Sequence, residues 1–200
     1  GQNLADRLPL LDRKTYPYAC AYREYLTDDS RLVIANVRDA ATRGAVVGNY
    51  VEVTGLATER GSMRGMRCRC SLSGEEFLIQ AKTVVNAAGP WVETVCRMDD
   101  SPARGTRQTL HLAKGIHISL PREKLPVDHL LVMNTHDGRS IFTIPRGDVV
   151  FIGTTDNTYH RAPRLWPEIE LEEVDYLLHP LTNYFDVAPL SASDCIAAWA

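Results

Sequence analysis

The sequence RSIFTIPRGDVVFIGTT, residues 139–155, contains two runs of β-branched and aromatic residues separated by the turn-forming tripeptide Arg146-Gly147-Asp148. Runs of this length and composition, bounded by turn residues, are typical of β-strands. The strands expected in this half of the chain span residues 111–120, 128–134, 139–145 and 148–155, with a further turn at 136–138. The pattern predicts a twisted antiparallel sheet.

A helix is expected to follow the sheet, over residues 170–185. Apolar residues recur there at helical spacing, at positions 174, 177, 178, 181 and 185. Pro180 lies within the segment and is expected to end or kink the helix, because proline removes a helical hydrogen bond.

The first half of the chain begins with an expected strand over residues 18–26, where aromatic and charged residues alternate. N-capping residues at 27–30 then open a helix that extends to about Arg43, and Gly44 follows at a position typical of a left-handed C-cap. The apolar stripe of this helix consists of Val33, Val37, Ala40 and Ala41. A short buried strand is expected over residues 45–47.

Three antiparallel strands are expected next. They span residues 50–58, 66–72 and 75–81, with turns at 61–65 and 73–74.

The segment TVVNAAGPW, residues 83–91, is expected to be an apolar strand that runs directly into a helix. Small residues at 87–89 allow a ligand to approach the backbone, and Pro90 suits the first helical turn. The N–H groups of such a turn favour an anionic or polar ligand. The spacing is also that of a tight turn in which glycine serves packing alone.

Composition excludes several classes of protein. The 200 residues carry 22 Lys and Arg against 25 Asp and Glu, a formal charge of −3, and 44% are hydrophobic. These values are those of an ordinary globular chain, and the lack of a basic excess argues against a nucleic-acid partner. The apolar runs are far shorter than the roughly 20 residues of a membrane helix. Five cysteines without a CxxC pair indicate a reducing compartment and no metal site.

Neither end of the sequence resembles the natural terminus of a protein. The chain begins at Gly1 and stops within the apolar run 194–200, where a strand end would expose unpaired backbone groups. We expect the sequence to be a piece of a longer protein.

Four motifs stand out in chain order: NAAGPW at 86–91, KGIHI at 114–118, DGRSIF at 137–142 and IGTTD at 152–156. Together with the expected helix at 27–41, the segment 49–56 and Trp199-Ala200, they resemble the FAD-dependent glycerol-3-phosphate dehydrogenases. The resemblance extends from about Tyr18 through nearly the whole chain. The GxGxxG motif of that family has no counterpart here, and the arginines that it places after the final strand would lie beyond Ala200.

The resemblance implies an α+β fold. It would contain an antiparallel substrate-domain sheet with flanking helices, together with the β-meander and return strand of a FAD-binding domain of the glutathione-reductase type. Residues 1–48 would lead from the substrate domain to the flavin domain. Residues 49–105 would form the flavin-domain meander, return strand and helix, and 106–200 the truncated substrate-binding domain.

The resemblance also implies a reaction. An enzyme of this family oxidises sn-glycerol 3-phosphate to dihydroxyacetone phosphate, with a hydride passing from C2 to the flavin N5 and the electrons continuing to a quinone. The C2 hydroxyl then needs a base, and His117 is the candidate because an imidazole titrates near neutral pH. Strand alternation places Gly115 and His117 on one face and Lys114 and Ile116 on the other. Lys114 and His117 can therefore converge only if the strand twists or bulges, and a histidine on a strand is otherwise often a packing residue.

The remaining site residues follow from the resemblance. The substrate-binding set is Lys114, Arg139, Thr154, Thr155 and Asp156, and the cofactor-binding set for FAD is Val53, Ala88, Gly89 and Trp91. Lys114 could equally be a solvated edge charge, and Asp156 a turn former.

Two other interpretations stay open: a glycine-oxidase-like flavin amine or hydroxy-acid oxidoreductase, and a structural module without activity. The chain by itself is expected to be inactive. The parent protein is expected to be cytoplasmic or peripheral at the inner face of the cell membrane, and to be a homodimer.

Overall fold

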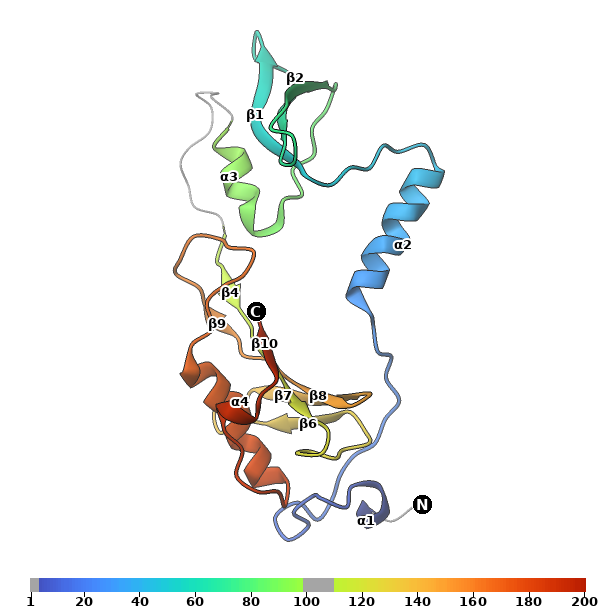
Figure 1. Cartoon of the computed structure of the whole chain (residues 1–200), viewed down its shortest axis with the longest axis vertical. Coiled ribbons are helices and arrows are strands. Elements are labelled where there is room, and N and C mark those ends of the chain that lie inside the picture. Colours follow the sequence, from blue (N-terminus) through green and yellow to red (C-terminus); the bar gives the residue numbers. More distant parts are fainter. Residues whose placement is uncertain (1–3, 99–109) are drawn as a thin grey trace. The chain divides into compact units, whose positions relative to one another are not determined.

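The computed structural model describes residues 4–98 and 110–200, and the contacts divide the chain into two compact units. Unit 1 combines Gly1–Ala21 with His111–Ala200, and unit 2 consists of Tyr22–Leu110. Each unit has its own antiparallel sheet (Figure 1). The domain boundary expected at residues 105–106 lies outside the described residues.

Unit 1 is built on a five-stranded antiparallel sheet with the order β10-β5-β8-β7-β6. Its strands are β5 (His117–Pro121), β6 (Leu131–Asn134), β7 (Ser140–Arg146), β8 (Val149–Gly153) and β10 (Ala197–Trp199). A separate short ladder joins β4 (Ala113–Lys114) to β9 (Asn157–Thr158). The 3-10 turn η2 (Ala192–Asp194) leads into β10. The prediction of an antiparallel sheet in this half of the chain is confirmed.

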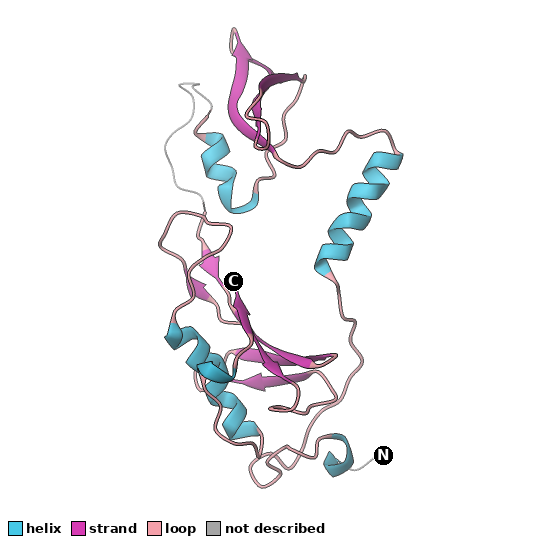
Figure 2. Cartoon of the chain, viewed as in Figure 1, coloured by secondary structure: helices cyan, strands magenta, loops and turns pink. Residues whose placement is uncertain are grey.

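Helix α4 (Leu171–Tyr184) packs against one face of this sheet (Figure 2). Every residue of its predicted apolar stripe is buried, and the stripe shares one core with Ile118, Leu120, Val150 and Ile152 of the sheet. Burying such side chains contributes about 1.5–3 kcal/mol each. The helix continues four residues past Pro180, so the proline does not end it.

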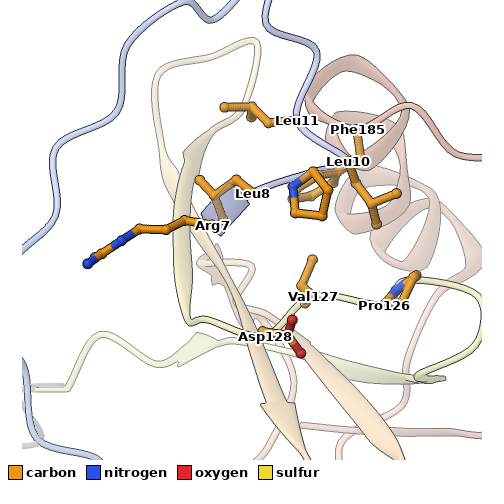
Figure 3. Close-up of a pocket in the computed structure, with 9 residues that line it drawn as sticks. Arg7, Leu8, Leu10, Leu11, Pro126, Val127, Asp128 and Phe185 are labelled. Carbon is orange, nitrogen blue, oxygen red and sulfur yellow. The ribbon is translucent and has the colours of Figure 1, made fainter. Parts of the chain in front are cut away.

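The N-terminal segment of unit 1 packs across the end of α4. After α1 (Leu4–Arg7), Leu11 forms a β-bridge with Phe185, and the ring of Tyr16 stacks on that of Tyr184 at 4.2 Å. Figure 3 shows the small pocket left by this packing, whose lining includes Leu8, Leu10 and Val127.

Unit 2 contains a three-stranded antiparallel sheet with the order β1-β2-β3. Its elements are α2 (Asp29–Thr42), β1 (Val51–Glu59), β2 (Ser62–Cys70), β3 (Glu76–Gln80), the 3-10 turn η1 (Gly89–Trp91) and α3 (Val92–Cys96). The predicted capping of α2 is confirmed. Asp28 accepts a hydrogen bond from the amide of Arg31 at 3.0 Å, and Gly44 has a φ of +91°. The three predicted strands are confirmed as well, with β2 beginning four residues earlier than expected.

Three predicted strands are wrong. Residues 18–26 have no ladder partner among the described residues, and residues 45–47 are exposed rather than buried. Residues 83–88 form a loop before η1 instead of a strand. Alternation of residue types gives a segment the period of a strand, but a strand also requires a hydrogen-bonded neighbour, and the described part of the chain supplies none to these segments.

The turn between β1 and β2 also differs from the prediction. It consists of Arg60 and Gly61, both with positive φ, and not of residues 61–65. Such two-residue turns match the twist of the strands that they join. Gly65 lies within β2 instead, where a Cβ atom would come 2.9 Å from the backbone carbon of Ile79. Glycine is needed there because the neighbouring strand approaches closely.

Residues 4–98 and 110–200 contain no helix with the length and hydropathy needed to cross a membrane. All five cysteines are free, and Cys68 is buried on β2. No group of three or more potential metal ligands occurs among the described residues.

Candidate functional site

His117 begins β5 and lies on the sheet face opposite α4. The register places it directly across from Gly153 on β8 and from Trp199 on β10. The neighbouring Ile118 points into the core beneath α4. Because side chains alternate along a strand, His117 projects from the other face, which α4 does not cover.

Two neighbours determine where the His117 ring lies. A Cβ atom on Gly153 would stand 2.7 Å from Nε2 of His117, so the imidazole occupies space that glycine leaves open. The ring also stacks on Trp199, with centroids 5.4 Å apart and planes inclined by 7°. Phe151 meets the same tryptophan edge to face at 5.1 Å. The histidine is thus surrounded by apolar and aromatic groups.

Burial lowers the pKa of the His117 imidazole below its ordinary value. A partly desolvated ring is less stable as a cation than as the neutral form. Strands β8 and β10, which pair with β5, carry no titratable residue that could raise the pKa of His117 again. At neutral pH the ring is therefore predominantly neutral and able to accept a proton.

The expected strand over 111–120 is interrupted at Gly115 and Ile116. A Cβ atom on Gly115 would meet Thr154 Oγ1 at 2.5 Å and Thr155 O at 2.7 Å, so the segment after β8 occupies the place of a side chain. The hydroxyl of Thr155, which is buried, accepts a hydrogen bond from the Ile116 amide at 3.0 Å. The segment 114–116 and the segment 154–156 carry most of the predicted substrate-binding residues, and these contacts hold the two segments against each other.

Lys114 does not converge with His117. Its Nζ atom donates to Glu173 Oε2 and to the carbonyl of Glu168, each at 2.7 Å, and the side chains of Lys114 and Glu173 are both 9% exposed. Burial raises the pKa of Glu173, but hydrogen bonds from the backbone at Glu170 and from Lys114 and Asn157 lower it more. Glu173 is therefore an anion at neutral pH, and Lys114 is tied to α4 by a buried ion pair.

Arg139 lies beside the segment of Thr154, Thr155 and Asp156. Its Nη1 atom donates to the carbonyl of Asp156 at 2.5 Å, and its Nε lies 3.4 Å from Asp137. Thr154 donates to the carbonyl of Thr155 at 2.9 Å. The structure places all five predicted substrate-binding residues and His117 in unit 1: on β4, on β5, directly before β7, and in the segment between β8 and β9.

The predicted cofactor-binding residues all lie in unit 2. Val53 is on β1, opposite Cys68 of β2. The loop that holds Ala88 is ordered by Asn86, which donates to Val92 O at 2.8 Å and accepts from the Ala88 amide at 3.3 Å. Gly89 has a φ of +52°, and no described atom lies within 4 Å of the place where its Cβ would stand.

Three residues that shape this geometry were missed as functional candidates in the sequence: Gly153, Trp199 and Glu173. In the sequence, Gly153 was recognised only as part of the IGTTD motif and Trp199 only as part of the last strand, and neither was given a role of its own. Glu173 is separated from Lys114 by 59 residues, and no local pattern joins two positions so far apart. Asn86, which orders the Ala88 loop, was likewise quoted in a motif without a role.

The matches with known proteins agree with this arrangement of sheets and helices. The family model for FAD dependent oxidoreductases (DAO) matches residues 1–200. The chain therefore belongs to the FAD dependent oxidoreductase family.

Its similarities within the family are more specific. The chain is 34% identical to an alpha-glycerophosphate oxidase of Streptococcus pyogenes serotype M1 over 90% of its own length and 29% of the relative's. It is also 34% identical to the aerobic glycerol-3-phosphate dehydrogenase of Bacillus subtilis (strain 168), over 90% of the chain and 32% of that protein. The sequence resemblance is thus confirmed.

A solved structure shares the fold. It is the glycerol-3-phosphate dehydrogenase from Bacillus halodurans complexed with FAD, with a TM-score of 0.85 and 35% identity, over 98% of this chain and 39% of that one. The prediction of a mixed fold with helices and antiparallel sheets is confirmed by this match. The chain spans about a third of the length of these relatives.

Proposed function

We propose that the chain is part of a flavin-dependent dehydrogenase that oxidises sn-glycerol 3-phosphate to dihydroxyacetone phosphate, with His117 as the base. The observation that carries this proposal is the half-buried His117 ring on the uncovered face of the sheet, kept neutral by burial. The names of the relatives support a phosphorylated alcohol as substrate, rather than the amine or hydroxy acid of a glycine-oxidase-like enzyme.

The oxidation breaks two bonds of the substrate alcohol. The C2–H bond leaves with its electron pair as hydride, the O–H bond releases a proton, and a C=O double bond forms. His117 takes the proton on a ring nitrogen, which general-base catalysis requires to be unprotonated beforehand. When bound, FAD supplies the oxidant that takes up the hydride.

Within this proposal, Arg139, Thr154, Thr155 and Asp156 hold the substrate, and Lys114 acts beside them. The side chain of Arg139 is 47% exposed and keeps further N–H donors for a phosphate group beyond the one on Asp156. Lys114 places two of its three N–H donors on Glu168 and Glu173. Its contribution is then chiefly to anchor the segment that leads to His117.

The residues proposed to hold FAD are Val53, Ala88, Gly89 and Trp91. The open space at Gly89 fits this role, because a glycine with positive φ lets a cofactor approach the backbone without meeting a Cβ atom. Unit 2 would then be the β-meander and return segment of the flavin domain, within residues 49–105. Residues 106–200 would belong to the substrate-binding domain, and residues 1–48 would connect the two.

The proposal includes a quinone as electron acceptor, a homodimeric parent and a peripheral position at the inner face of the cell membrane. These parts rest on the family resemblance. Molecular oxygen is the second candidate acceptor, because several relatives are named oxidases.

The test is His117→Ala in the full-length protein, loaded with FAD. Loss of a general base typically costs on the order of 10²–10⁴-fold in turnover. We expect a loss of this size in kcat for glycerol 3-phosphate, with the FAD content unchanged. The matched control is His129→Ala, an exposed histidine of the same unit, which should leave kcat unaltered. Near-normal turnover of His117→Ala would assign the ring to packing.

The 200-residue chain by itself is expected to be colourless and inactive. Its sequence contains no GxGxxG motif, which in FAD-binding folds holds the pyrophosphate of the cofactor. A yellow preparation with stoichiometric FAD would contradict this part of the proposal.

A further inference from the structure

Three adjacent strands place Trp199, His117 and Gly153 in one row across the sheet. Trp199 pairs with His117, and His117 pairs with Gly153, in the register of β10, β5 and β8. Paired residues project from the same face of an antiparallel sheet, with Cβ atoms about 4.5–5.5 Å apart. The tryptophan and the glycine are therefore the direct lateral neighbours of the histidine.

Gly153 is suited to this row by its missing side chain and not by its backbone conformation. Its φ lies outside the positive range in which the other turn glycines are found. A Cβ atom there would nevertheless stand 2.7 Å from Nε2 and 2.8 Å from Cγ of His117. Any residue larger than glycine would drive the imidazole out of its present position.

Trp199 limits the ring from the other side. Its indole lies nearly parallel to the imidazole, and Phe151 in turn packs edge to face against the indole. Aromatic pairs in such offset-stacked and edge-to-face arrangements are worth about 0.5–1.5 kcal/mol beyond the area that they bury. The indole covers part of one face of the imidazole and so contributes to its burial.

We infer that Trp199 and Gly153 are positioning residues for His117, and that together they fix the orientation and the dry environment in which its ring accepts the substrate proton. The inference rests on the proposed function for its catalytic meaning. The stacking of Trp199 on His117 and the need for glycine at position 153 can nevertheless be tested on the chain without cofactor or substrate.

The first experiment is an NMR titration of the His117 ring in the 200-residue chain and in two variants, Trp199→Phe and Trp199→Ala. Burial is the cause of the lowered pKa, so removing the indole should raise the pKa of His117 toward its ordinary value. Phenylalanine keeps a stacking ring and should keep most of the depression. The same pKa in wild type and Trp199→Ala would overturn the inference.

Gly153→Ala supplies an independent measurement. The added methyl group displaces the ring, so we expect the nuclear Overhauser contacts between His117 and Trp199 to weaken while the signals of the α4 core stay in place. Retention of those contacts in a folded Gly153→Ala chain would show that the glycine does not position the ring. If Trp199→Ala does not fold, the comparison of wild type with Trp199→Phe and Gly153→Ala still decides the question.

The second experiment uses the full-length, FAD-loaded protein and separates positioning from packing. Displacement of a catalytic group by about 1 Å can cost 10²-fold. Trp199→Ala should therefore lower kcat by about that factor with little change in KM, and shift the acidic limb of the pH profile upward, whereas Trp199→Phe should restore both. A loss of thermal stability without a change in the pH profile would mean that Trp199 only packs.

The two experiments distinguish the failure of this inference from that of the proposed function. If His117→Ala retains normal turnover but Trp199→Ala changes the pKa of His117, the catalytic role fails and the structural relation holds. If His117→Ala is inactive and Trp199→Ala changes neither pKa nor pH profile, the proposed function survives and this inference does not.

Discussion

Helices α2 and α4 have the same length, 14 residues, yet they are stabilised in different ways. Helix α4 of unit 1 has six buried residues, four of which belong to the core shared with the sheet, whereas α2 of unit 2 has none. The same contrast holds for the units as wholes. Of the buried apolar residues in the described part of the chain, all but Cys68 lie in unit 1.

This difference shows that two kinds of sequence signal act along one chain. Unit 2 is specified by local features, namely the Asp28 cap, Gly44, the Arg60-Gly61 turn and the turn at Ser73-Gly74. Unit 1 is specified by contacts between residues far apart in the sequence, which converge in a single core. Substitutions in unit 1 should therefore be costly and global, and those in unit 2 small and local.

The largest effect is expected from Lys114→Met in unit 1. The substitution leaves the carboxylate of Glu173 buried without its cation, and breaking a buried pair in this way typically costs about 3–5 kcal/mol. Urea unfolding should show the loss as a lowered midpoint. The matched control in unit 2 is Arg69→Met, which breaks an exposed pair with Glu52 and should change the midpoint little. Equal effects of the two substitutions would contradict the contrast between the units.

The pH dependence of unit 1 follows from the same pair. The folded-state pKa of Glu173 is lowered, so its contribution to stability is present above the ordinary carboxyl pKa and is lost as the pH falls through the folded value. Lys114→Met removes the cation that stabilises the carboxylate. The variant should therefore lose less stability than wild type as the pH falls from neutral to below the folded-state pKa of Glu173, as measured by urea midpoints.

A core truncation gives the next largest effect. Leu177 of α4 is fully buried, and Leu→Ala at such sites costs about 2–5 kcal/mol through lost burial and the cavity that remains. Val33 of α2 is 60% exposed, and Val33→Ala should change the free energy of unfolding by no more than about 0.5 kcal/mol. Urea unfolding of both variants measures the difference. A large cost at Val33 would show that α2 has a packing partner within this chain.

The sequence predicted those parts of the fold that depend on local signals. The caps of α2, the stripe of α4 and the turn at Arg146-Gly147-Asp148 were recognisable because a few adjacent residues determine each of them. The β1–β2 turn was misplaced, because Gly65 resembles a turn glycine but lies within β2. The strand expected over 18–26 failed because its alternating pattern carries no information about a partner strand.

The candidate site was predictable only in part, for the same reason. The motif around His117 pointed to the residue, and alternation correctly separated it from Lys114. Trp199, the stacking partner of His117, lies 82 positions further along the chain. Its contact with His117 depends on strand register, as does the room that Gly153 leaves for the imidazole, and a single sequence does not reveal the register. Prediction of the remaining site residues rests on the resemblance, and their roles stay predictions.

The smallest effect, Asp28→Ala, tests the local character of unit 2. Asp28 satisfies the amide of Arg31 at the start of α2, and loss of such a cap costs about 1 kcal/mol of helix stability. Because α2 buries no residue, no packing compensates, and an isolated helix of this length is marginal in water. We therefore expect amide hydrogen exchange to accelerate along α2, from Asp29 to Thr42, while α4 and the urea midpoint of unit 1 stay unchanged.

Asp28→Asn is the matched control, since asparagine caps about as well as aspartate without its charge and should preserve the slow exchange. If alanine and asparagine act alike, the charge of Asp28 at the helix N-terminus matters more than its hydrogen bond. If neither changes the exchange of α2, the helix is held by contacts beyond its own sequence, and the proposed contrast between a locally specified and a core-specified unit fails at its simplest element.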